Sequence, residues 1–287
     1  MTNDKNYTIA KTDDGTIQIT YSIAYSDIKK VKDDVALELG KDLEIPGFRK
    51  GNAPLDKILA NIPESTLIEK TLSKILPRLF SETIDSEKIK PILFPKFELI
   101  KAKENEDWQV ITKTAEFPVF NLNNYKETIK NAINSKNILK PGDNKEKVLS
   151  REEREQIVIK TLLETISINI PKVLIDEEVQ NRFSRILEQI DKLGLTIDTY
   201  LTSIGKKLED IKKEYEKQSK DTLSLDLILS EISKNEKFSI SENDINEAVK
   251  ASSAVSELEK ELDNPEKRRL IESILLKRKA LNFLTSL

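Results

Sequence analysis

Hydrophobic and polar residues alternate strictly along residues 16–23, near the start of the chain. The residues that fall on one face of this segment are Ile17, Ile19, Tyr21 and Ile23. A period of two is typical of a half-buried strand. Asp13-Asp14-Gly15 just before it is a turn signal. The pattern therefore predicts a β-hairpin that pairs residues 7–10 with residues 16–23.

From Ser26 the apolar residues recur every three or four positions, which predicts an amphipathic helix with Ser26 and Asp27 as candidate N-terminal caps. Two further helices are expected at 54–60 and 64–85, followed by strand-like runs at 94–101 and 108–117. Strands, helices and strands again predict an α+β domain over residues 1–130, in which helices pack on one face of a small antiparallel sheet.

The second half of the chain has a different pattern. Residues 131–150 are mostly polar and contain Pro141-Gly142, which is linker composition. Beyond them we expect an elongated, all-α domain over residues 151–287. Its predicted helices are 151–166, 176–193 with Gly194 as a C-terminal cap, a long helix from Asp198 or Lys206 to Lys234, 242–255 opened by a capping box at Ser241–Asp244, and 265–284.

The composition restricts the chemistry. Lys and Arg number 47 and Asp and Glu 50, a net charge of −3, so a polyanionic partner must be held by a local patch. The chain has no Cys and no His. That removes disulfides, thiolate metal sites, the commonest general base and every Ser-His or Cys-His nucleophile. We therefore expect no catalytic site, no metal and no cofactor.

The first residues, Met1 to Tyr7, do not combine a basic start with an apolar run, so no secretory signal is expected. No apolar stretch approaches the roughly 20 residues that a membrane span requires. The sequence therefore predicts a cytoplasmic protein that does not enter a membrane.

The most informative segment is the loop 45–54, in which Gly47 and Gly51 bracket Phe48, Arg49 and Lys50. The glycines allow sharp turns that present the three side chains outward, where the cations could bind a polyanion or an acidic protein patch. The residues alone leave a second interpretation open, a tight turn whose phenylalanine packs back on the core.

This loop resembles the signature Gly-Phe-Arg-x-Gly-x-x-Pro of bacterial trigger factor, which it matches at Gly47, Phe48, Arg49, Gly51 and Pro54. Three other segments are similar to parts of the family. Residues 116–125 resemble the exit from its ribosome-binding domain, 168–175 part of its substrate-cradling domain, and 277–284 its closing helix. The resemblance covers nearly the whole chain.

The resemblance implies an ATP-independent chaperone that docks beside the ribosomal exit tunnel and shields nascent or unfolded chains. Gly47, Phe48, Arg49, Lys50 and Gly51 would form the docking tip, facing a large-subunit protein and rRNA. Asn52 departs from the family, which often has a lysine there. The family usually carries an FK506-binding-type prolyl isomerase domain between its other two domains. Residues 131–150 are too few to contain one, so no isomerase activity is expected.

Apolar stripes in the helical half could supply patches for an unfolded client, but they are also typical of helix-bundle core. No substrate-binding residue is assigned for this reason. The candidate stripes are Ile186, Ile190 and Leu193, and Leu223, Leu225, Leu227 and Ile228. The alternatives are a ribosome-independent helical holdase, residual prolyl isomerase activity and a helical scaffold for one folded partner. The sequence leaves homodimer formation open.

Overall fold

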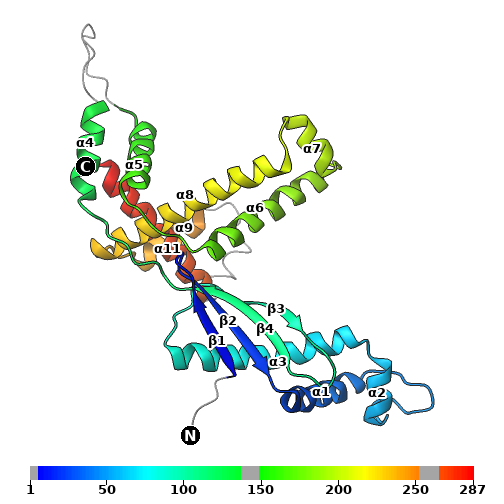
Figure 1. Cartoon of the computed structure of the whole chain (residues 1–287). Coiled ribbons are helices and arrows are strands. Elements are labelled where there is room, and N and C mark those ends of the chain that lie inside the picture. Colours follow the sequence, from blue (N-terminus) through cyan, green and yellow to red (C-terminus); the bar gives the residue numbers. More distant parts are fainter. Residues whose placement is uncertain (1–5, 137–148, 252–264) are drawn as a thin grey trace, which may run out of the picture. The chain divides into compact units, whose positions relative to one another are not determined.

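A computed structural model describes residues 6–136, 149–251 and 265–287 of the chain (Figure 1). The chain divides into two units. The first takes the chain up to Pro118 together with the short segment Pro171–Leu174, and the second consists of Val119–Ile170 and Ile175–Leu287. The chain therefore leaves the first unit, returns to it for four residues and leaves again. Each unit is described by itself below.

The first unit contains a four-stranded antiparallel sheet in the order β1-β2-β4-β3 (Figure 1). The predicted hairpin is confirmed, since β1 pairs with β2 in a register that places Ile9 opposite Ile19. Gly15 occupies the turn with a φ of 87°, a conformation that glycine adopts without strain. The strands are β1 (Tyr7–Lys11), β2 (Thr16–Ile23), β3 (Lys96–Lys101) and β4 (Trp108–Ala115).

Three helices accompany this sheet: α1 (Tyr25–Gly40), α2 (Leu55–Asn61) and α3 (Glu64–Glu87). The predicted apolar face of β2 is buried against Leu76 and Phe80 of α3 and Ile28 of α1. This confirms the small antiparallel sheet with packed helices. The buried residues of this cluster are Ile17, Ile19, Tyr21, Ile23, Ile28, Leu76, Phe80, Ile89, Trp108 and Val110.

The expected caps of the first helix are wrong. Helix α1 begins at Tyr25, and its N-cap residue is Ala24. The side chain of Ala24 makes no capping hydrogen bond. Instead Asp107 accepts a hydrogen bond from the backbone N–H of Tyr25, with an N–O distance of 2.9 Å. Asp107 comes directly before β4, whose first residue, Trp108, pairs with Ile23 at the end of β2. The sheet register therefore brings a distant carboxylate to the helix start, where it satisfies a free N–H.

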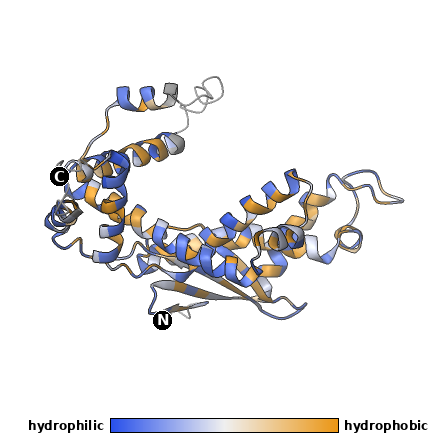
Figure 2. Cartoon of the chain, turned by 90° about the horizontal axis from the view of Figure 1, so that it is seen from above, coloured by the Kyte–Doolittle hydropathy of each residue, from blue (hydrophilic) through white to orange (hydrophobic). Residues whose placement is uncertain are grey.

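The described part of the second unit contains helices and no strand, which agrees with the predicted all-α half. Figure 2 shows hydrophobic and hydrophilic residues interleaved along the helices, as amphipathic packing requires. The helices are α4 (Tyr125–Lys136), α5 (Arg151–Thr165), α6 (Lys172–Lys192), α7 (Ile197–Ile204), α8 (Leu208–Asn235), α9 (Glu242–Ala251) and α11 (Pro265–Thr285), of which α6 starts within the segment that belongs to the first unit.

Residues 131–136 are not linker, contrary to the prediction, because α4 continues to Lys136 and buries Ile129 and Ile133 on one face. Four-residue spacing on a helix aligns these two side chains, and that outweighs the polar residues between them. Leu149 is buried as well, and Ser150 opens α5 by a capping box with Glu153. Residues 137–148, with the predicted Pro141-Gly142 breaker, lie outside the described residues.

The compact units meet at residue 118, whereas the predicted first domain extends to residue 130. Helix α4 therefore belongs to the second unit. The assignment of a separate function to residues 1–130 and 151–287 stays a prediction.

Glycines end helices in the second unit. Gly194 follows α6 with a φ of 67°, close to the predicted cap. Gly205, with a φ of 65°, separates α7 from α8, so the long helix starts at Leu208, near the later of its two expected starts. The capping box of Ser241 and Asp244 is confirmed by hydrogen bonds in both directions. Residues 252–255, the end of the fourth predicted helix, lie outside the described residues.

Within the described residues, no helix combines the length and the apolar character that crossing a membrane requires.

Candidate functional site

The loop 45–54 lies between α1 and α2, and close packing of these two helices positions it. A Cβ atom added to Gly40, the last residue of α1, would lie 2.5 Å from Cδ1 of Ile58 on α2. A real Cβ atom does not tolerate such a distance. Glycine at this position therefore lets Ile58 of α2 pack directly against the end of α1.

A second core cluster holds both ends of the loop. Ile45 before the tip is 6 % exposed, and Ala53 after it packs against the same cluster. The buried members of this cluster are Val35, Ala36, Ile45, Ile58, Ile62 and Leu67. The tip between Ile45 and Ala53 is thus a short projection with two fixed ends, which limits its conformational freedom.

Two successive turns form the tip. The N–H of Phe48 donates to the carbonyl of Ile45 at 3.1 Å, and the N–H of Asn52 donates to the carbonyl of Arg49 at 2.9 Å. The third residues of these turns are Gly47 and Gly51, with φ angles of 86° and 79°. A positive φ at the third position is characteristic of a type II turn and favours glycine. The bracketing glycines therefore have the role that the sequence predicts.

The tip brings Phe48, Arg49 and Lys50 together on the surface. Phe48 is 40 % exposed, and both cations are exposed. Lys50 lies 3.7 Å from the carboxylate of Asp42, but these side chains are 55 % and 93 % exposed, so the ion pair stabilises the loop by well under 1 kcal/mol. Within the part of the chain that is described, the guanidinium of Arg49 makes no hydrogen bond or ion pair. Of the two interpretations, the geometry favours an outward tip.

The chemistry of this tip is recognition. It offers an aromatic surface beside two cations, a combination that suits phosphates or an acidic protein patch. Apart from the exposed amine of Lys50, it contains no nucleophile and no general acid or base. Among the described residues, no group of three or more metal-ligating side chains is placed to hold a metal ion. The docking role of Gly47, Phe48, Arg49, Lys50 and Gly51 stays a prediction.

The apolar stripes of the second unit divide into core and surface. Ile190, Leu227 and Ile228 are at most 8 % exposed and belong to the core, as their spacing also allows. Leu193, by contrast, is 71 % exposed. It lies at the end of α6, where α7 connects α6 to α8.

Four further exposed residues in this region were missed by the sequence patterns. We call the whole set the apolar end; it consists of Leu187, Leu193, Leu195, Ile204 and Leu208, which are between 39 % and 71 % exposed. Three of its members come directly before or after Gly194 and Gly205. The sequence signal for these exposed residues was an apolar residue next to a glycine that ends a helix. Such a residue lies where one helix ends and no longer shields the apolar side chains of the helix beside it.

Two family models match the chain, and together they extend from residue 5 to residue 286. The model described as bacterial trigger factor protein (TF) matches residues 5–140, and the one described as bacterial trigger factor protein (TF) C-terminus matches residues 123–286, more than half of the chain. The two matches overlap at residues 123–140. No residues therefore lie between them in which an FK506-binding-type domain could be inserted.

Curated relatives are similar over parts of the chain. The trigger factor of Corynebacterium glutamicum (strain R) is 29 % identical over 119 residues, which is 42 % of this chain and 26 % of the relative. That of Streptococcus mutans serotype c is 27 % identical over 158 residues, which is 55 % of this chain and 36 % of the relative. The chain thus spans about a quarter to a third of the length of the curated relatives that it matches.

Among the solved structures that are similar in fold is one of a trigger factor chaperone. It concerns promiscuous substrate recognition in folding and assembly activities of the trigger factor chaperone, and it aligns with a TM-score of 0.64 and 13 % sequence identity. The alignment covers 98 % of this chain and 99 % of that one. At this identity the likeness supports the arrangement of helices and strands and no particular residue role.

Proposed function

Because this chain belongs to the bacterial trigger factor family, we propose that it is an ATP-independent chaperone of the cytoplasm that docks at the ribosomal exit tunnel and shields nascent or unfolded chains. Residues up to about 130 provide the anchor, and residues 151–287 hold the client. Its partners are the large ribosomal subunit, through protein and rRNA at the exit, and non-native polypeptides.

The observation that carries the docking proposal is the geometry of the tip. Two glycine turns with positive φ angles project Phe48, Arg49 and Lys50 from ends that are fixed in a core cluster. A rigid projection loses little conformational entropy on binding, so a small contact area can suffice. Gly47, Phe48, Arg49 and Gly51 of this tip match the family signature.

The three side chains contribute differently to docking. Arg49 makes no ion pair in the free chain within the described residues, so its guanidinium can pair with a phosphate or carboxylate without first breaking a bond. Lys50 has only a weak, solvent-exposed partner in Asp42. Phe48 supplies apolar surface that docking would remove from water. Because cation contacts to phosphates release counterions, docking should weaken as salt increases.

Holding a client requires exposed apolar surface rather than catalytic groups. The apolar end supplies such surface around the connections of α6, α7 and α8. Polar and charged residues intervene between its members, as at Lys206 and Lys207. Weak, dispersed contacts of this kind suit many unrelated unfolded sequences, and no energy source is needed to release them.

We also propose that the chain is not a prolyl isomerase. The two family matches overlap at residues 123–140, which leaves no segment between them for an inserted FK506-binding-type domain. An assay that follows cis–trans isomerisation in a proline-containing peptide should give the uncatalysed rate. Catalysis by the purified chain would contradict this part of the proposal.

The docking proposal is tested by pelleting with ribosomes. The triple variant Phe48→Ala, Arg49→Ala, Lys50→Ala should reduce co-sedimentation by tenfold or more. The two charge-assisted contacts and the burial of the aromatic ring on docking are each worth on the order of 1 kcal/mol or more. Circular dichroism and a thermal melt should match the parent protein, because all three side chains are exposed.

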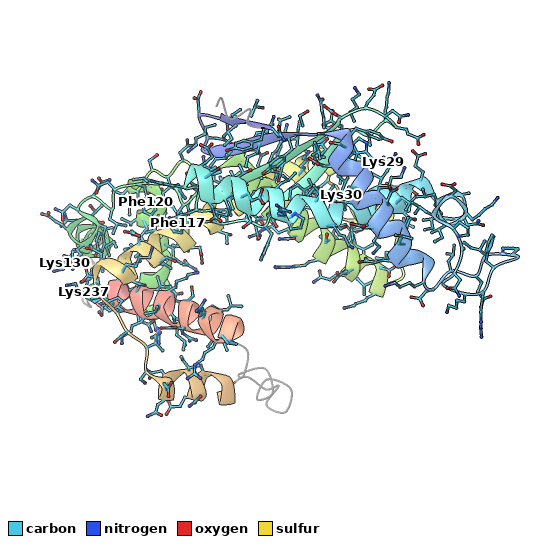
Figure 3. All side chains as sticks on the ribbon, turned by 90° about the horizontal axis from the view of Figure 1, so that it is seen from below. Lys29, Lys30, Phe117, Phe120, Lys130 and Lys237 are labelled. Carbon is cyan, nitrogen blue, oxygen red and sulfur yellow. The ribbon has the colours of Figure 1, made fainter. Side chains whose placement is uncertain are left out.

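A matched control removes one exposed apolar residue and two exposed cations elsewhere in the same unit. Leu37, Lys29 and Lys30 on α1 meet this description, and Figure 3 shows the two lysines on that helix. Their replacement by Ala should leave pelleting unchanged. Equal loss in both triple variants would mean that net charge drives binding, and unchanged pelleting of the tip variant would refute docking through the tip.

A further inference from the structure

Strand β3 forms one edge of the sheet in the first unit. The order β1-β2-β4-β3 gives it a single neighbour, so the backbone groups on its outer side have no strand partner within that sheet. All its residues except Phe97 and Lys101 are exposed, whereas its neighbour β4 is mostly buried. An uncovered edge of this kind is a template for another extended chain.

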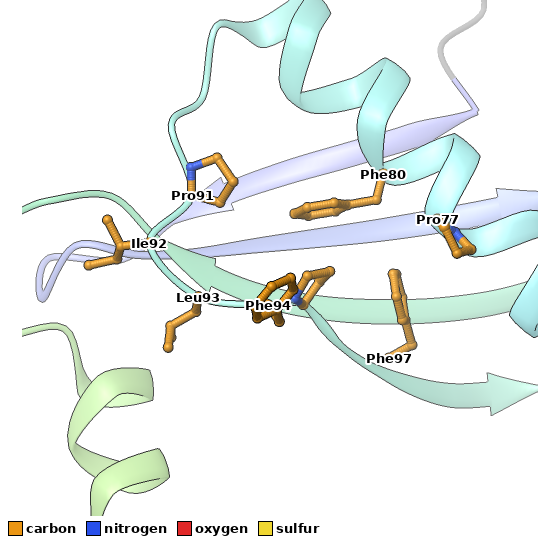
Figure 4. Close-up of a pocket in the computed structure, with 8 residues that line it drawn as sticks. Pro77, Phe80, Pro91, Ile92, Leu93, Phe94 and Phe97 are labelled. Carbon is orange, nitrogen blue, oxygen red and sulfur yellow. The ribbon is translucent and has the colours of Figure 1, made fainter. Parts of the chain in front are cut away.

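An apolar cavity of about 510 Å³ adjoins this edge. Three prolines, three phenylalanines, Ile92 and Leu93 line it, with no charged residue among them. Figure 4 shows Phe80 on α3 and Phe97 on β3, with the segment 91–95 leading into the strand. The Phe80 and Phe97 rings lie edge to face, with 6.2 Å between centroids. The volume lies in the range of small-ligand sites, large enough for apolar side chains.

The fold holds this cavity open. Pro91 and Pro95 restrict the backbone of the lining segment, and the N–H of Ile92 donates to the carbonyl of Ala115 at the end of β4, at 3.0 Å. Phe94 between the prolines is 94 % exposed. A phenylalanine that is almost fully exposed contributes little to packing within the unit. Its apolar surface is therefore available for contact with another molecule.

We infer that this edge and cavity bind an extended, apolar segment of a non-native polypeptide. The segment pairs with β3 as a fifth strand, and its alternate side chains enter the cavity beside Phe80, Phe94 and Phe97. Strand addition of this kind takes affinity from main-chain hydrogen bonds and selectivity from pockets for alternate side chains. The site therefore selects apolar character and an extended backbone rather than a sequence.

The strand limits the length of the bound segment. Regular pairing in β3 runs from Lys96 to Leu99, and the register shifts between Leu99 and Lys101. Pro95 has no N–H to offer. Four residues of strand span about 14 Å, so the segment pairs over about four to six residues. Lys96 and Glu98 lie on the face of β3 opposite Phe97, away from the apolar side chains of the guest.

An unfolded chain is favoured over the other occupants. A small apolar ligand would fill the cavity but add no second strand beside β3. A second folded copy would have to bring its own exposed edge to β3, whereas an unfolded chain can present any extended segment to it. The inference is separate from docking at the tip, since a purified peptide tests it without ribosomes.

The experiment uses the full chain labelled with ¹⁵N and an eight-residue peptide with leucine or phenylalanine at alternate positions, threonine between them and lysine at the ends. Two further peptides carry N-methyl groups, one on all apolar residues and one on all threonines. In a strand, the N–H groups of alternate residues point to opposite sides. Only one methylated peptide can then keep the hydrogen bonds to β3.

We expect the unmodified peptide to shift the amide signals of Lys96–Leu99. One methylated peptide should bind about tenfold more weakly and the other about equally well, since two or three backbone hydrogen bonds are lost in only one of them. Phe94→Asp should weaken binding by about tenfold. Leu37→Asp, at a position that is 48 % exposed on α1, should leave it unchanged. Both side chains are exposed, so both variants should fold.

Four results would overturn the inference. Absence of binding would do so directly. Equal binding by both methylated peptides would show that side chains alone bind to the cavity, as for a small apolar ligand. Signals that shift only in the second unit would locate the peptide elsewhere. Amide shifts of Lys96–Leu99 that appear on raising the protein concentration without peptide would make a second copy the occupant.

Discussion

The carboxylate of Asp14 accepts a hydrogen bond from the backbone N–H of Lys172, with an N–O distance of 2.7 Å, although 158 residues separate the two. Asp14 lies in the turn between β1 and β2 and also accepts from the N–H and hydroxyl of Thr16. Pro171 lies against the same turn, where its Cγ would be 3.4 Å from a Cβ added to Gly15. The turn therefore fixes the returning segment Pro171–Leu174 within the first unit.

Asp14→Asn should make the unfolding free energy less dependent on pH in the acidic range. Partial burial raises the pKa of Asp14, but hydrogen bonds from Thr12, Lys172 and Thr16 outweigh it and lower the pKa from 3.8 to about 2. Because the pKa is lower in the folded than in the unfolded state, the ionised carboxylate stabilises the fold at any pH above the pKa of the unfolded state. That stabilisation is lost as pH falls from about 4 to 2. After a discount for solvent screening, we expect the Asp14 carboxylate to contribute roughly 1 kcal/mol to the unfolding free energy at pH 7.

The measurement is denaturant unfolding at pH 7, 4 and 2. The difference in unfolding free energy between the parent and Asp14→Asn should be largest at pH 7 and close to zero at pH 2. Asp85→Asn, at an exposed carboxylate in the last turn of α3, is the control for the substitution itself. A difference that stays constant from pH 7 to pH 2 would show that geometry, not charge, is what Asp14 provides.

Glu236 connects α4 to the end of α8 in the second unit. Its carboxylate accepts from the hydroxyl of Tyr125 at 2.6 Å and pairs with Lys126 at 2.7 Å. Burial, together with this carboxylate, raises the pKa of Tyr125. Glu236→Ala removes both contacts and leaves the Tyr125 hydroxyl buried without this acceptor. We expect a loss of about 1.5–3 kcal/mol in unfolding free energy.

Glu231→Ala is the control for this prediction. Glu231 also pairs with a lysine on α8, but the side chains of Glu231 and Lys234 are 40 % and 66 % exposed and 3.3 Å apart. Its removal should cost less than about 0.5 kcal/mol. Equal losses for both variants in denaturant unfolding would mean that helix propensity rather than the Tyr125 contact sets the stability.

Gly47 is expected to matter to docking through its backbone alone. A Cβ at this position would meet no atom within 4 Å, yet the φ of 86° is one that side-chain-bearing residues rarely adopt. Gly47→Val should disfavour the turn by about 1–2 kcal/mol and weaken ribosome pelleting by several-fold. Gly47→Asn, which tolerates positive φ better, should retain most binding. Equal binding by both variants would show that docking does not need this turn.

Local features of the fold could be predicted from the sequence, and distant ones could not. The alternation in β2 and the turn at Gly15 are sufficient to specify the hairpin, because all its contacts are short-range. The hydrogen bond from Tyr25 to Asp107 crosses 82 residues, and nothing near Ser26 reveals that a distant carboxylate replaces its cap. The same holds for the return of Pro171–Leu174 to the first unit.

The candidate sites divide in the same way. The tip could be predicted because glycines on both sides of Phe48 and Lys50 specify turns by backbone conformation alone. The apolar end could not be predicted from helical spacing alone, which gives Ile190 and Leu193 the same periodic pattern although one is 4 % and the other 71 % exposed. Which leucine is covered depends on where a neighbouring helix ends. The edge of β3 likewise follows from strand order, which no local pattern contains.

Leu193→Asp with Leu208→Asp should impair client holding while the fold is kept. The two leucines are 71 % and 50 % exposed, so charge at these positions costs little stability. Contact with an unfolded chain would bury on the order of 50 Å² at each leucine, worth about 1 kcal/mol per residue, so client affinity should fall by about tenfold or more. Light scattering of unrelated denatured proteins, with the chain in equal molar amount, should show weaker suppression of aggregation.

The matched variant is Leu270→Asp with Ile274→Asp on α11, where the two side chains are 61 % and 54 % exposed. It removes a similar apolar surface from another part of the same unit and should leave suppression close to that of the parent. If both double variants lose suppression equally, client holding depends on total exposed apolar surface rather than on the apolar end. If neither loses it, the client is held elsewhere, and the cavity beside β3 becomes the first alternative, because Phe94→Asp should then reduce suppression where the leucine variants do not.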